Sequence, residues 1–306
     1  MTRLWPAVSY DRWGATCDTL HAHTQVLGKL AVQLAPPEPE LQHAALRLTA
    51  RGWETGPLPA PDGTGSLVVA LDLRTHEAVV EHSGGSEERI PLTPDRPVAE
   101  VTRDVLAAVA RAGGAVQIYL TPQEVPWSVP LVDDYQHARY DPGQVDDYFA
   151  AATQAALALA AFRAAYRGRS TPVNAWWGSF DLSVTLFSGA AADPPRDGFI
   201  TRNASDAEQV VVGWWPGHPG HPKSALYAFA YPAPPEFAQA TLSPAAARWD
   251  ETLSEYILDW DDVRAAPDPR AAAVDFAHSA FHHAYLVSGW SDELGATAEG
   301  RPPPVR

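Results

Sequence analysis

The chain has 306 residues, of which 46% are hydrophobic and 19% charged, and its formal net charge at pH 7 is −15. A chain of this length and composition can bury a large core, which excludes a wholly disordered protein. The negative charge, with no cluster of Lys and Arg, argues against nucleic acid or an anionic membrane surface as a partner. No apolar run approaches the roughly 20 residues that span a bilayer. With no signal-peptide pattern and with Cys17 as the only cysteine, we expect a cytoplasmic protein without disulfide bonds.

The first part of the chain is predicted to begin with a helix and to continue with strands. Hydrophobic residues fall at spacings of three and four over 8–27, which is typical of a helix, and we expect Gly28 to end it. Runs of alternating hydrophobic residues then follow, separated by loops rich in Pro, Gly and Asp. These runs predict strands at 29–35, 43–50, 66–73, 77–83 and 88–92. A second helix over 98–112 leads into a strand at 115–120.

The second half repeats this order after an irregular, Pro-rich segment at 121–142. A long Ala-rich helix is predicted over 143–167, with its large residues on one face. Strands are predicted at 174–187, 208–215 and 225–231, and helices at 244–256 and 269–288.

The short loops between these strands indicate the fold class. Such loops can join only antiparallel strands, so the sequence predicts an α+β protein with helices packed on one face of antiparallel sheet. Two halves with the order α-β-β-β-α are consistent with a degenerate duplication. We place an N-terminal half at 1–120, a Pro-rich connection at 121–142, a C-terminal half at 143–295 and a loose tail at 296–306. One continuous unit is favoured over two independently folding domains.

The segment DTLHAHTQVLGK contains the first group of candidate site residues. On a helix His21 and Gln25 share a face, whereas His21 and His23 do not. Lys29 is expected just past the helix end, where the helix dipole favours a cation. Only two of the 22 Lys and Arg residues are lysines, which makes this position notable. The structural alternative is one buried His, one solvated His and a capping Lys.

The strand predicted at 174–187 supplies a second group. Alternation along a strand places Trp177 and Asp181 on the same face, together with Ser and Thr side chains. An aromatic ring beside a carboxylate suits the floor of a site for a polar organic ligand. A solvent-facing sheet surface is the alternative.

A third group consists of the aromatic side chains Trp214, Trp215 and Tyr227, which either line a pocket or belong to the core. The pairs His218/His221 and His278/His282 have only weak metal-ligand spacing, and no metal site is predicted from them. The sequence also contains none of the short motifs for dinucleotides, phosphates, serine hydrolases or zinc proteases. No cofactor is therefore predicted.

Several stretches, read in order, resemble a bacterial family of unknown function, DUF5996. They are WPAVSYDRWGATCDTLHAHTQVLGK, RGWETGPLP, PVNAWWGSFDLSVTLFSG and LSEYILDWDDVRAAPDP, with shorter matches such as QHARYDP and GWWPG. The resemblance implies no known activity. It implies that polar residues typical of the family are retained, among them His21, Gln25, Lys29, His137, Tyr140, Trp177, Asp181, Glu208 and Glu255. Three histidines typical of the family are replaced, by Glu40, Asn174 and Ala207, which marks the chain as a divergent member.

Three functions are compatible with these observations. The first is an enzyme acting on a small organic molecule, with His21 or His137 as general acid/base oriented by Asp181, Glu208 or Glu255. Its ligand-binding residues would be Gln25, Lys29, Tyr140, Trp177, Trp214, Trp215 and Tyr227. The second is a ligand-binding or sensor protein that uses the same aromatic pocket without catalysis. The third is an interaction or scaffold subunit. A second copy of the chain is considered as a partner, because homodimers are the commonest oligomers.

Overall fold

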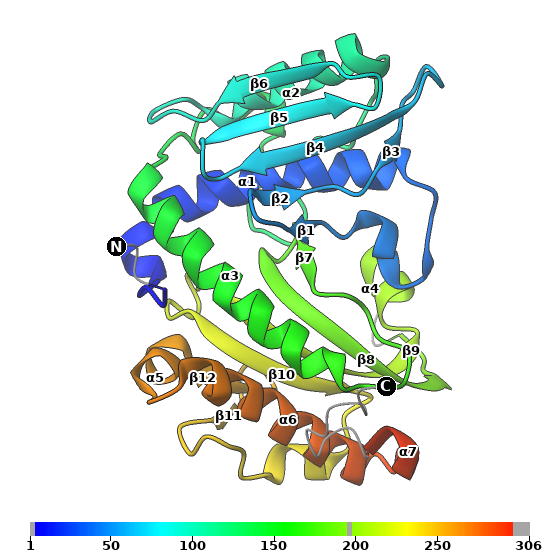
Figure 1. The fold of residues 1–306 in the computed structure, drawn as a ribbon, viewed down its shortest axis with the longest axis vertical. Coiled ribbons are helices and arrows are strands. Elements are labelled where there is room, and N and C mark those ends of the chain that lie inside the picture. Colours follow the sequence, from blue (N-terminus) through cyan, green and yellow to red (C-terminus); the bar gives the residue numbers. More distant parts are fainter. Residues whose placement is uncertain (1–3, 195–197, 296–306) are drawn as a thin grey trace. The chain divides into compact units, whose positions relative to one another are not determined.

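The computed structural model describes residues 4–194 and 198–295 (Figure 1). It confirms the predicted α+β class, with two antiparallel sheets and helices. The chain divides into two compact units, each made of separate stretches of sequence. Unit 2 comprises Tyr10–Phe149 and Asn174–Asp181, and unit 1 comprises the described residues outside these two ranges. The segment 121–142 therefore belongs to unit 2, and the predicted loose tail at 296–306 lies outside the described residues.

Unit 2 is an antiparallel sheet with helices on one of its faces (Figure 1). The strands are paired in the order β1-β2-β4-β5-β6, with β3 on β4. Helices α1 and α2 both pack on this sheet and on each other. The elements are α1 (Tyr10–Leu34), a 3₁₀ helix (Pro39–Ala44), β1 (Arg47–Leu48), β2 (Gly52–Glu54), β3 (Leu58–Pro59), β4 (Ser66–Asp72), β5 (Glu77–His82), β6 (Glu87–Pro91), α2 (Val98–Gly113), a 3₁₀ turn (Leu131–Asp133) and β7 (Asn174–Trp176).

Helix α1 is the central element of unit 2. Every residue from Thr19 to Ala31 is buried, on all sides of the helix. A helix in this position is expected to be hydrophobic all round, yet the buried stretch includes His21, Gln25 and Lys29. Buried polar groups need partners, so the neighbouring segments must supply hydrogen bonds to this helix.

The predicted strand at 29–35 is wrong, because α1 continues through Gly28 to Leu34. Gly28 does not break the helix. It makes room for an aromatic ring, since a Cβ at this position would lie 2.0 Å from Cγ of Trp177. The local preference of glycine for turns is overridden by packing that the sequence pattern cannot show.

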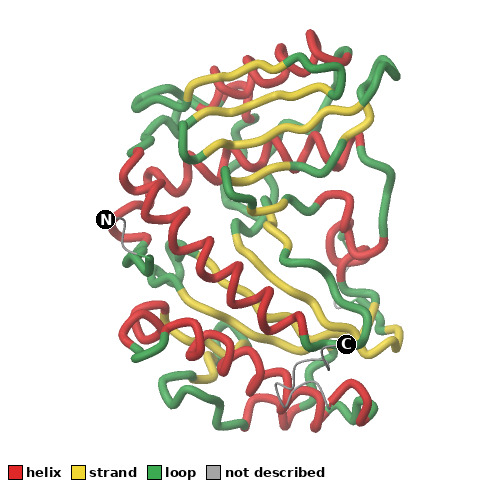
Figure 2. Tube along the Cα trace, in the orientation of Figure 1, coloured by secondary structure: helices red, strands yellow, loops and turns green. Residues whose placement is uncertain are grey.

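Three further strand predictions are wrong or too long. Residues 115–120 form no strand, and apart from the 3₁₀ turn the whole segment between α2 and α3 is loop (Figure 2). The predicted strand at 174–187 is interrupted by a turn over residues 177–180, where Phe180 has a φ of 57°. This turn breaks the alternation that placed Trp177 and Asp181 on one sheet face. The predicted strand at 43–50 shrinks to β1.

Unit 1 contains the second sheet, with the strand order β11-β12-β10-β9-β8. Aromatic contacts join its long helices, as where Phe162 of α3 meets Phe281 of α6 with ring centroids 6.3 Å apart. The elements are α3 (Pro142–Ala164, in unit 1 from Ala150), β8 (Asp181–Ala191, in unit 1 from Leu182), α4 (Phe199–Ala204), β9 (Ala207–Trp215), β10 (Ala225–Tyr231), a 3₁₀ helix (Pro235–Gln239), β11 (Arg248–Asp250), β12 (Glu255–Asp259), α5 (Trp260–Ala265), α6 (Pro269–Val287) and α7 (Asp292–Gly295).

The helix predicted at 244–256 is wrong, because this stretch forms β11 and the start of β12. Asp250 explains the difference. Its carboxylate accepts hydrogen bonds from the backbone N–H groups of Thr252 and Leu253, and its carbonyl accepts one from Ser254. Such an Asx turn competes with helix and favours a hairpin. No helix among the described residues is long and apolar enough to cross a membrane.

Candidate functional site

Polar side chains follow one face of α1 and form the candidate site in unit 2. Asp18, His21, Gln25 and Lys29 are separated by three or four residues and therefore lie along one side of the helix. We call these four residues the α1 stripe. The predicted common face of His21 and Gln25 is visible in their contact, since His21 Nε2 and Gln25 Nε2 are 3.4 Å apart.

His21 is held by the turn at 177–180. Its Nε2 lies 2.9 Å from the carbonyl oxygen of Trp177 and 3.0 Å from that of Gly178. Carbonyl oxygens only accept hydrogen bonds, so this nitrogen carries the proton and donates. The ring of Phe180 stacks on the imidazole with centroids 4.9 Å apart. Burial lowers the pKa of His21 to about 4, although the two carbonyl contacts act in the opposite direction. His21 is therefore neutral at pH 7.

Gln25 fastens a loop to the helix. Its Nε2 donates to the carbonyl oxygens of Gln123 (2.9 Å) and Trp177 (3.1 Å), and its Oε1 accepts from the backbone N–H of Gln123 (3.1 Å). Both ends of one buried amide are therefore satisfied by backbone groups. This arrangement holds two separate chain segments against α1.

Lys29 is buried, with only 3% of the residue exposed. Its Nζ donates to Oε1 of Gln123 (3.3 Å) and lies 5.1 Å and 5.3 Å from the ring centroids of Tyr119 and Trp177. No carboxylate of the described residues lies within 4.0 Å of this nitrogen. Burial lowers the pKa of Lys29 to about 8. The predicted position past the helix end is wrong, since the residue lies inside α1.

Residues 115–137, which we call the strap, run across the α1 stripe. Three of its residues are four positions apart and meet the stripe in reverse order, Tyr119 and Trp127 through their rings and Gln123 through its backbone, so the strap crosses the stripe from its C-terminal end to its N-terminal end. The contacts pair Tyr119 with Lys29, Gln123 with Gln25, and Trp127 with His21. These contacts hold a segment without regular secondary structure against α1.

The strap ends in a His–Asp pair. Nδ1 of His137 lies 2.7 Å from Oδ2 of buried Asp134, and the His137 ring packs on Trp127 with centroids 4.4 Å apart. Oδ1 of Asp134 accepts hydrogen bonds from the backbone N–H groups of Gln136 and His137. Burial favours the neutral carboxyl, but these hydrogen bonds outweigh it and lower the pKa of Asp134 below its usual range.

The other atoms of this pair are less constrained. Nε2 of His137 makes no hydrogen bond to any residue that the structure describes. Asp18 of the α1 stripe is near enough to His137 for an electrostatic interaction between the two side chains. Its carboxylate also accepts a hydrogen bond of 2.7 Å from the Tyr10 hydroxyl. His137 was predicted from the sequence, whereas Asp134 and Trp127 were not. The signal for Asp134 was present in the spacing Asp-x-x-His, which suits a carboxylate that orients an imidazole.

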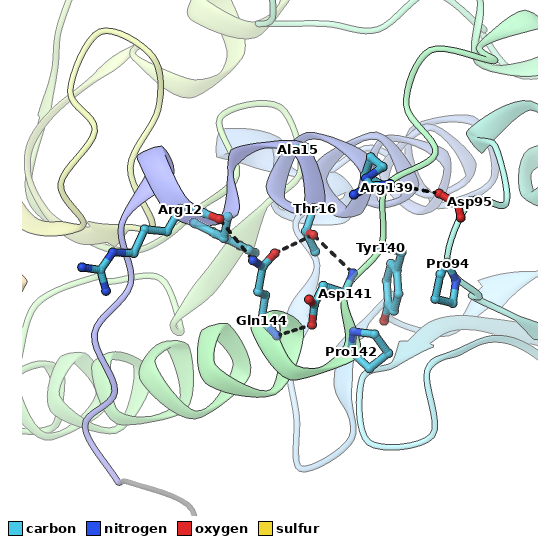
Figure 3. Close-up of a pocket in the computed structure, with 11 residues that line it drawn as sticks. Arg12, Ala15, Thr16, Pro94, Asp95, Arg139, Tyr140, Asp141, Pro142 and Gln144 are labelled. Atoms are coloured by element: carbon cyan, nitrogen blue, oxygen red, sulfur yellow. Dashed lines mark hydrogen bonds and ion pairs between the residues drawn. The ribbon is translucent and has the colours of Figure 1, made fainter.

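A cavity of about 380 Å³ lies elsewhere in unit 2 (Figure 3). It is lined by the first turns of α1 and by residues that follow His137 in the chain. Its polar side chains are largely paired with one another, since Thr16 bonds to Gln144 (2.7 Å) and to the backbone N–H of Asp141 (3.2 Å). The lining residues are Arg12, Trp13, Ala15, Thr16, Pro94, Asp95, Arg139, Tyr140, Asp141, Pro142 and Gln144. Tyr140 is thus the one predicted ligand-binding residue in this lining, and its hydroxyl lies 3.0 Å from Nδ1 of His76.

The remaining predicted residues are divided between the units. Trp177 and Asp181 belong to unit 2, where Ser179 donates a hydrogen bond to Asp181 and Trp177 Nε1 donates to the Ala44 carbonyl (3.1 Å). Unit 1 contains the other predicted aromatic and acidic residues. They are the fully buried Trp214, the stacked pair Trp215 and Tyr227 with centroids 5.1 Å apart, Glu208 on β9, and Glu255 at the start of β12.

Comparison with known families identifies the chain. A family model described as "Family of unknown function (DUF5996)" matches residues 5–296. The chain belongs to the DUF5996 family. No curated protein and no solved structure matches it. The described part of this DUF5996 chain contains no group of three or more His, Cys, Asp or Glu residues that could hold a metal ion. Asn174 accepts a hydrogen bond from Arg47 and donates one to Gln42.

The stability of this DUF5996 chain is expected to fall as the pH drops below about 6.5. Burial lowers the pKa of His21 to about 4 and that of His23 to about 3. Between these values and the unfolded pKa near 6.5, the unfolded chain binds more protons, so acid favours unfolding. Each residue contributes a slope of up to about 1.4 kcal/mol per pH unit.

Urea unfolding followed by tryptophan fluorescence at pH 7, 6 and 5 measures this slope. His21→Gln is expected to have a shallower slope than the wild type, whatever its stability at pH 7. Equal slopes in the two proteins would show that His21 already binds a proton in the folded state.

Proposed function

We propose that this chain is an acid–base enzyme that acts on a small organic molecule, with His137 as its general acid/base. The observation that carries the proposal is the 2.7 Å contact between His137 Nδ1 and buried Asp134. A carboxylate in this position orients the imidazole and fixes its tautomer, as in the dyads of many enzymes. Asp134 itself is held in place by two backbone N–H groups.

The proton positions follow from this geometry. The lowered pKa of Asp134 keeps the carboxylate ionised at neutral pH, so it accepts a hydrogen bond and His137 Nδ1 carries the proton. In the neutral ring the lone pair is then on Nε2, which has no hydrogen-bond partner among the described residues. Nε2 can take a proton from a bound molecule and return it, which is the role of a general base and then a general acid.

His21 is the weaker candidate of the two predicted bases. Its Nε2 proton is already committed to two backbone carbonyls, and a pKa of about 4 makes the imidazole a poor base at neutral pH. We assign His21 a positioning role, because it holds the turn at 177–180 against α1.

A non-catalytic ligand-binding protein is the second candidate. The cavity supports it, because its volume of about 380 Å³ lies in the range of small-molecule sites. Its lining offers hydrogen-bonding groups that are already paired with one another, as Figure 3 shows for Thr16, Asp141 and Gln144.

The enzyme proposal is tested with Asp134→Asn. An asparagine can donate to His137 Nδ1 and thereby favour the other tautomer, so we expect turnover to fall on the order of 100-fold. Wild type and variant are incubated with a defined panel of aldehydes, ketones, esters and amides, and consumption is followed by mass spectrometry. In parallel, ¹H–¹⁵N NMR of the imidazoles reports the His137 tautomer.

The control is Asp275→Asn on α6 in unit 1, which leaves the strap untouched. Equal turnover by wild type and Asp134→Asn, or a wild-type His137 protonated on Nε2 alone, would contradict the proposal. Binding of panel compounds without any turnover would favour the second candidate.

A further inference from the structure

We propose that Lys29 is a nucleophilic amine that forms an imine with the carbonyl group of a small aldehyde, ketone or keto acid. The inference deepens the proposed function and rests on it for the substrate class, while the amine itself is tested independently. It concerns a residue that the acid–base pair does not use, at the far end of the α1 stripe.

The surroundings of Lys29 are unusual for a lysine. The side chain is buried in a helix that is covered on all sides, and no carboxylate of the described residues lies within 4.0 Å of Nζ. One amide oxygen, at 3.3 Å, uses a single donor of the three that an ammonium carries. The rings of Tyr119 and Trp177 occupy two other sides. A buried ammonium without a counter-ion is destabilised relative to the free amine.

The direction of the pKa shift agrees with this geometry. Burial alone lowers the pKa of Lys29 to about 8, without a contribution from any charged neighbour. Tyr119 is the titratable side chain that faces the amine. A desolvated lysine with a lowered pKa is the usual form of an imine-forming residue.

The strap provides a route to this amine. Its first residues, 115–119, form no hydrogen bond with any part of the chain that the structure describes. Tyr119 is 66% exposed although its ring lies over Lys29. Segments held by few hydrogen bonds open locally at low cost. A small carbonyl compound can therefore reach Nζ when Tyr119 moves aside, with no change in α1.

The step is balanced without any oxidant or reductant. The lone pair of neutral Lys29 Nζ forms a bond to the carbonyl carbon, and the carbonyl π electrons move to oxygen. A proton passes from nitrogen to that oxygen and gives a carbinolamine. The carbon–oxygen bond then breaks, the oxygen leaves with a further proton as water, and a carbon–nitrogen double bond remains. One amine and one carbonyl give one imine and one water.

Lys223 is an internal comparison, because the chain has only these two lysines. It belongs to unit 1, its side chain is 65% exposed, and its Nζ lies 2.7 Å from a carboxylate oxygen of Asp259. The hydrogen bond and the charge of Asp259 raise the pKa of Lys223. An exposed lysine is normally the easier one to modify, so preferential reaction at Lys29 cannot follow from access alone.

The test is reductive trapping. The full chain at pH 7.5 is incubated separately with propanal, dihydroxyacetone and pyruvate in the presence of cyanoborohydride, and peptides are mapped by mass spectrometry. With at least one of the three, we expect Lys29 to be trapped at least about 10-fold faster than Lys223, because a much larger fraction of its amine is unprotonated. Lys29→Arg should lose this product, whereas Lys223→Arg should retain it.

The outcomes separate the two proposals. The imine proposal is overturned if Lys29 stays unmodified in the folded protein with all three compounds but reacts in urea. It is also overturned if Lys223 is trapped as fast as Lys29. Trapping that persists in Asp134→Asn supports the amine even where turnover is lost. Turnover of a carbonyl compound by Lys29→Arg at the wild-type rate overturns the imine while leaving the acid–base pair in place.

Discussion

Replacing Gly28 with alanine is expected to lower the free energy of unfolding by about 3 kcal/mol. Helix propensity alone predicts the opposite sign, a gain of about 1 kcal/mol for alanine inside a helix. Packing should win because the new Cβ would lie 2.0 Å from Cγ of Trp177 and 2.1 Å and 2.2 Å from two neighbouring ring atoms. A buried indole that donates from Nε1 to the Ala44 carbonyl cannot move without losing that bond.

The loss should extend beyond the clash itself. The carbonyl of Trp177 accepts hydrogen bonds from His21 and Gln25. Displacement of Trp177 would therefore break the hydrogen bonds that hold the turn at 177–180 against α1. The free energy is measured by urea unfolding at pH 7 and by the thermal midpoint. Gly14→Ala is the matched control in the same helix, where the new Cβ would lie 3.0 Å from the partly exposed Tyr10 ring. A Gly28→Ala protein as stable as the wild type would show that Trp177 does not occupy this position.

Replacing His137 with glutamine is expected to lower turnover of the substrate found in the panel by about 100- to 10,000-fold. Glutamine keeps a polar side chain of similar reach but has no lone pair that accepts a proton near neutral pH. The rate is measured under single-turnover conditions, so that substrate binding and reaction are separated. Because His137 is partly exposed and acts through Nε2, folding should be affected much less than turnover.

The control for this variant is His282→Gln, at an exposed position on α6. It removes an imidazole from unit 1 and changes no residue of unit 2. A His137→Gln protein that keeps the wild-type rate rules out general acid/base catalysis by this residue. A loss of the same size in His282→Gln would show that the effect is not specific to the strap.

Sequence periodicity predicted those elements whose packing follows their own pattern. The strands β4, β5, β6, β9 and β10 and the helices α2, α3 and α6 were all predicted within a few residues of their observed limits. At Gly28 the prediction failed because one distant ring decides the local structure. Gly28 looks like a helix end, and only the presence of Trp177 beside it explains why the helix continues.

The candidate site could be predicted only in part, for a similar reason. The α1 stripe repeats every three or four residues, so the common face of His21 and Gln25 is visible in the sequence. The strap is a loop, and in a loop a spacing of four residues does not predict which side chains lie side by side. Asp134 and Trp127 were therefore missed, although they stand only three and ten residues before His137.

The order of the chain has a consequence for how the protein is made. The eight residues Asn174–Asp181 complete unit 2, yet they are translated after Ala150–Val173, which belong to unit 1. Until Trp177 and Gly178 have left the ribosome, His21 lacks the two carbonyl oxygens to which it donates, and the indole that packs against Gly28 is absent. During synthesis, one side of α1 therefore stays exposed until the segment around Trp177, some 150 residues further along the chain, has been made. For the same reason, any continuous fragment that contains unit 2 with the backbone acceptors of His21 also contains Ala150–Val173 of unit 1.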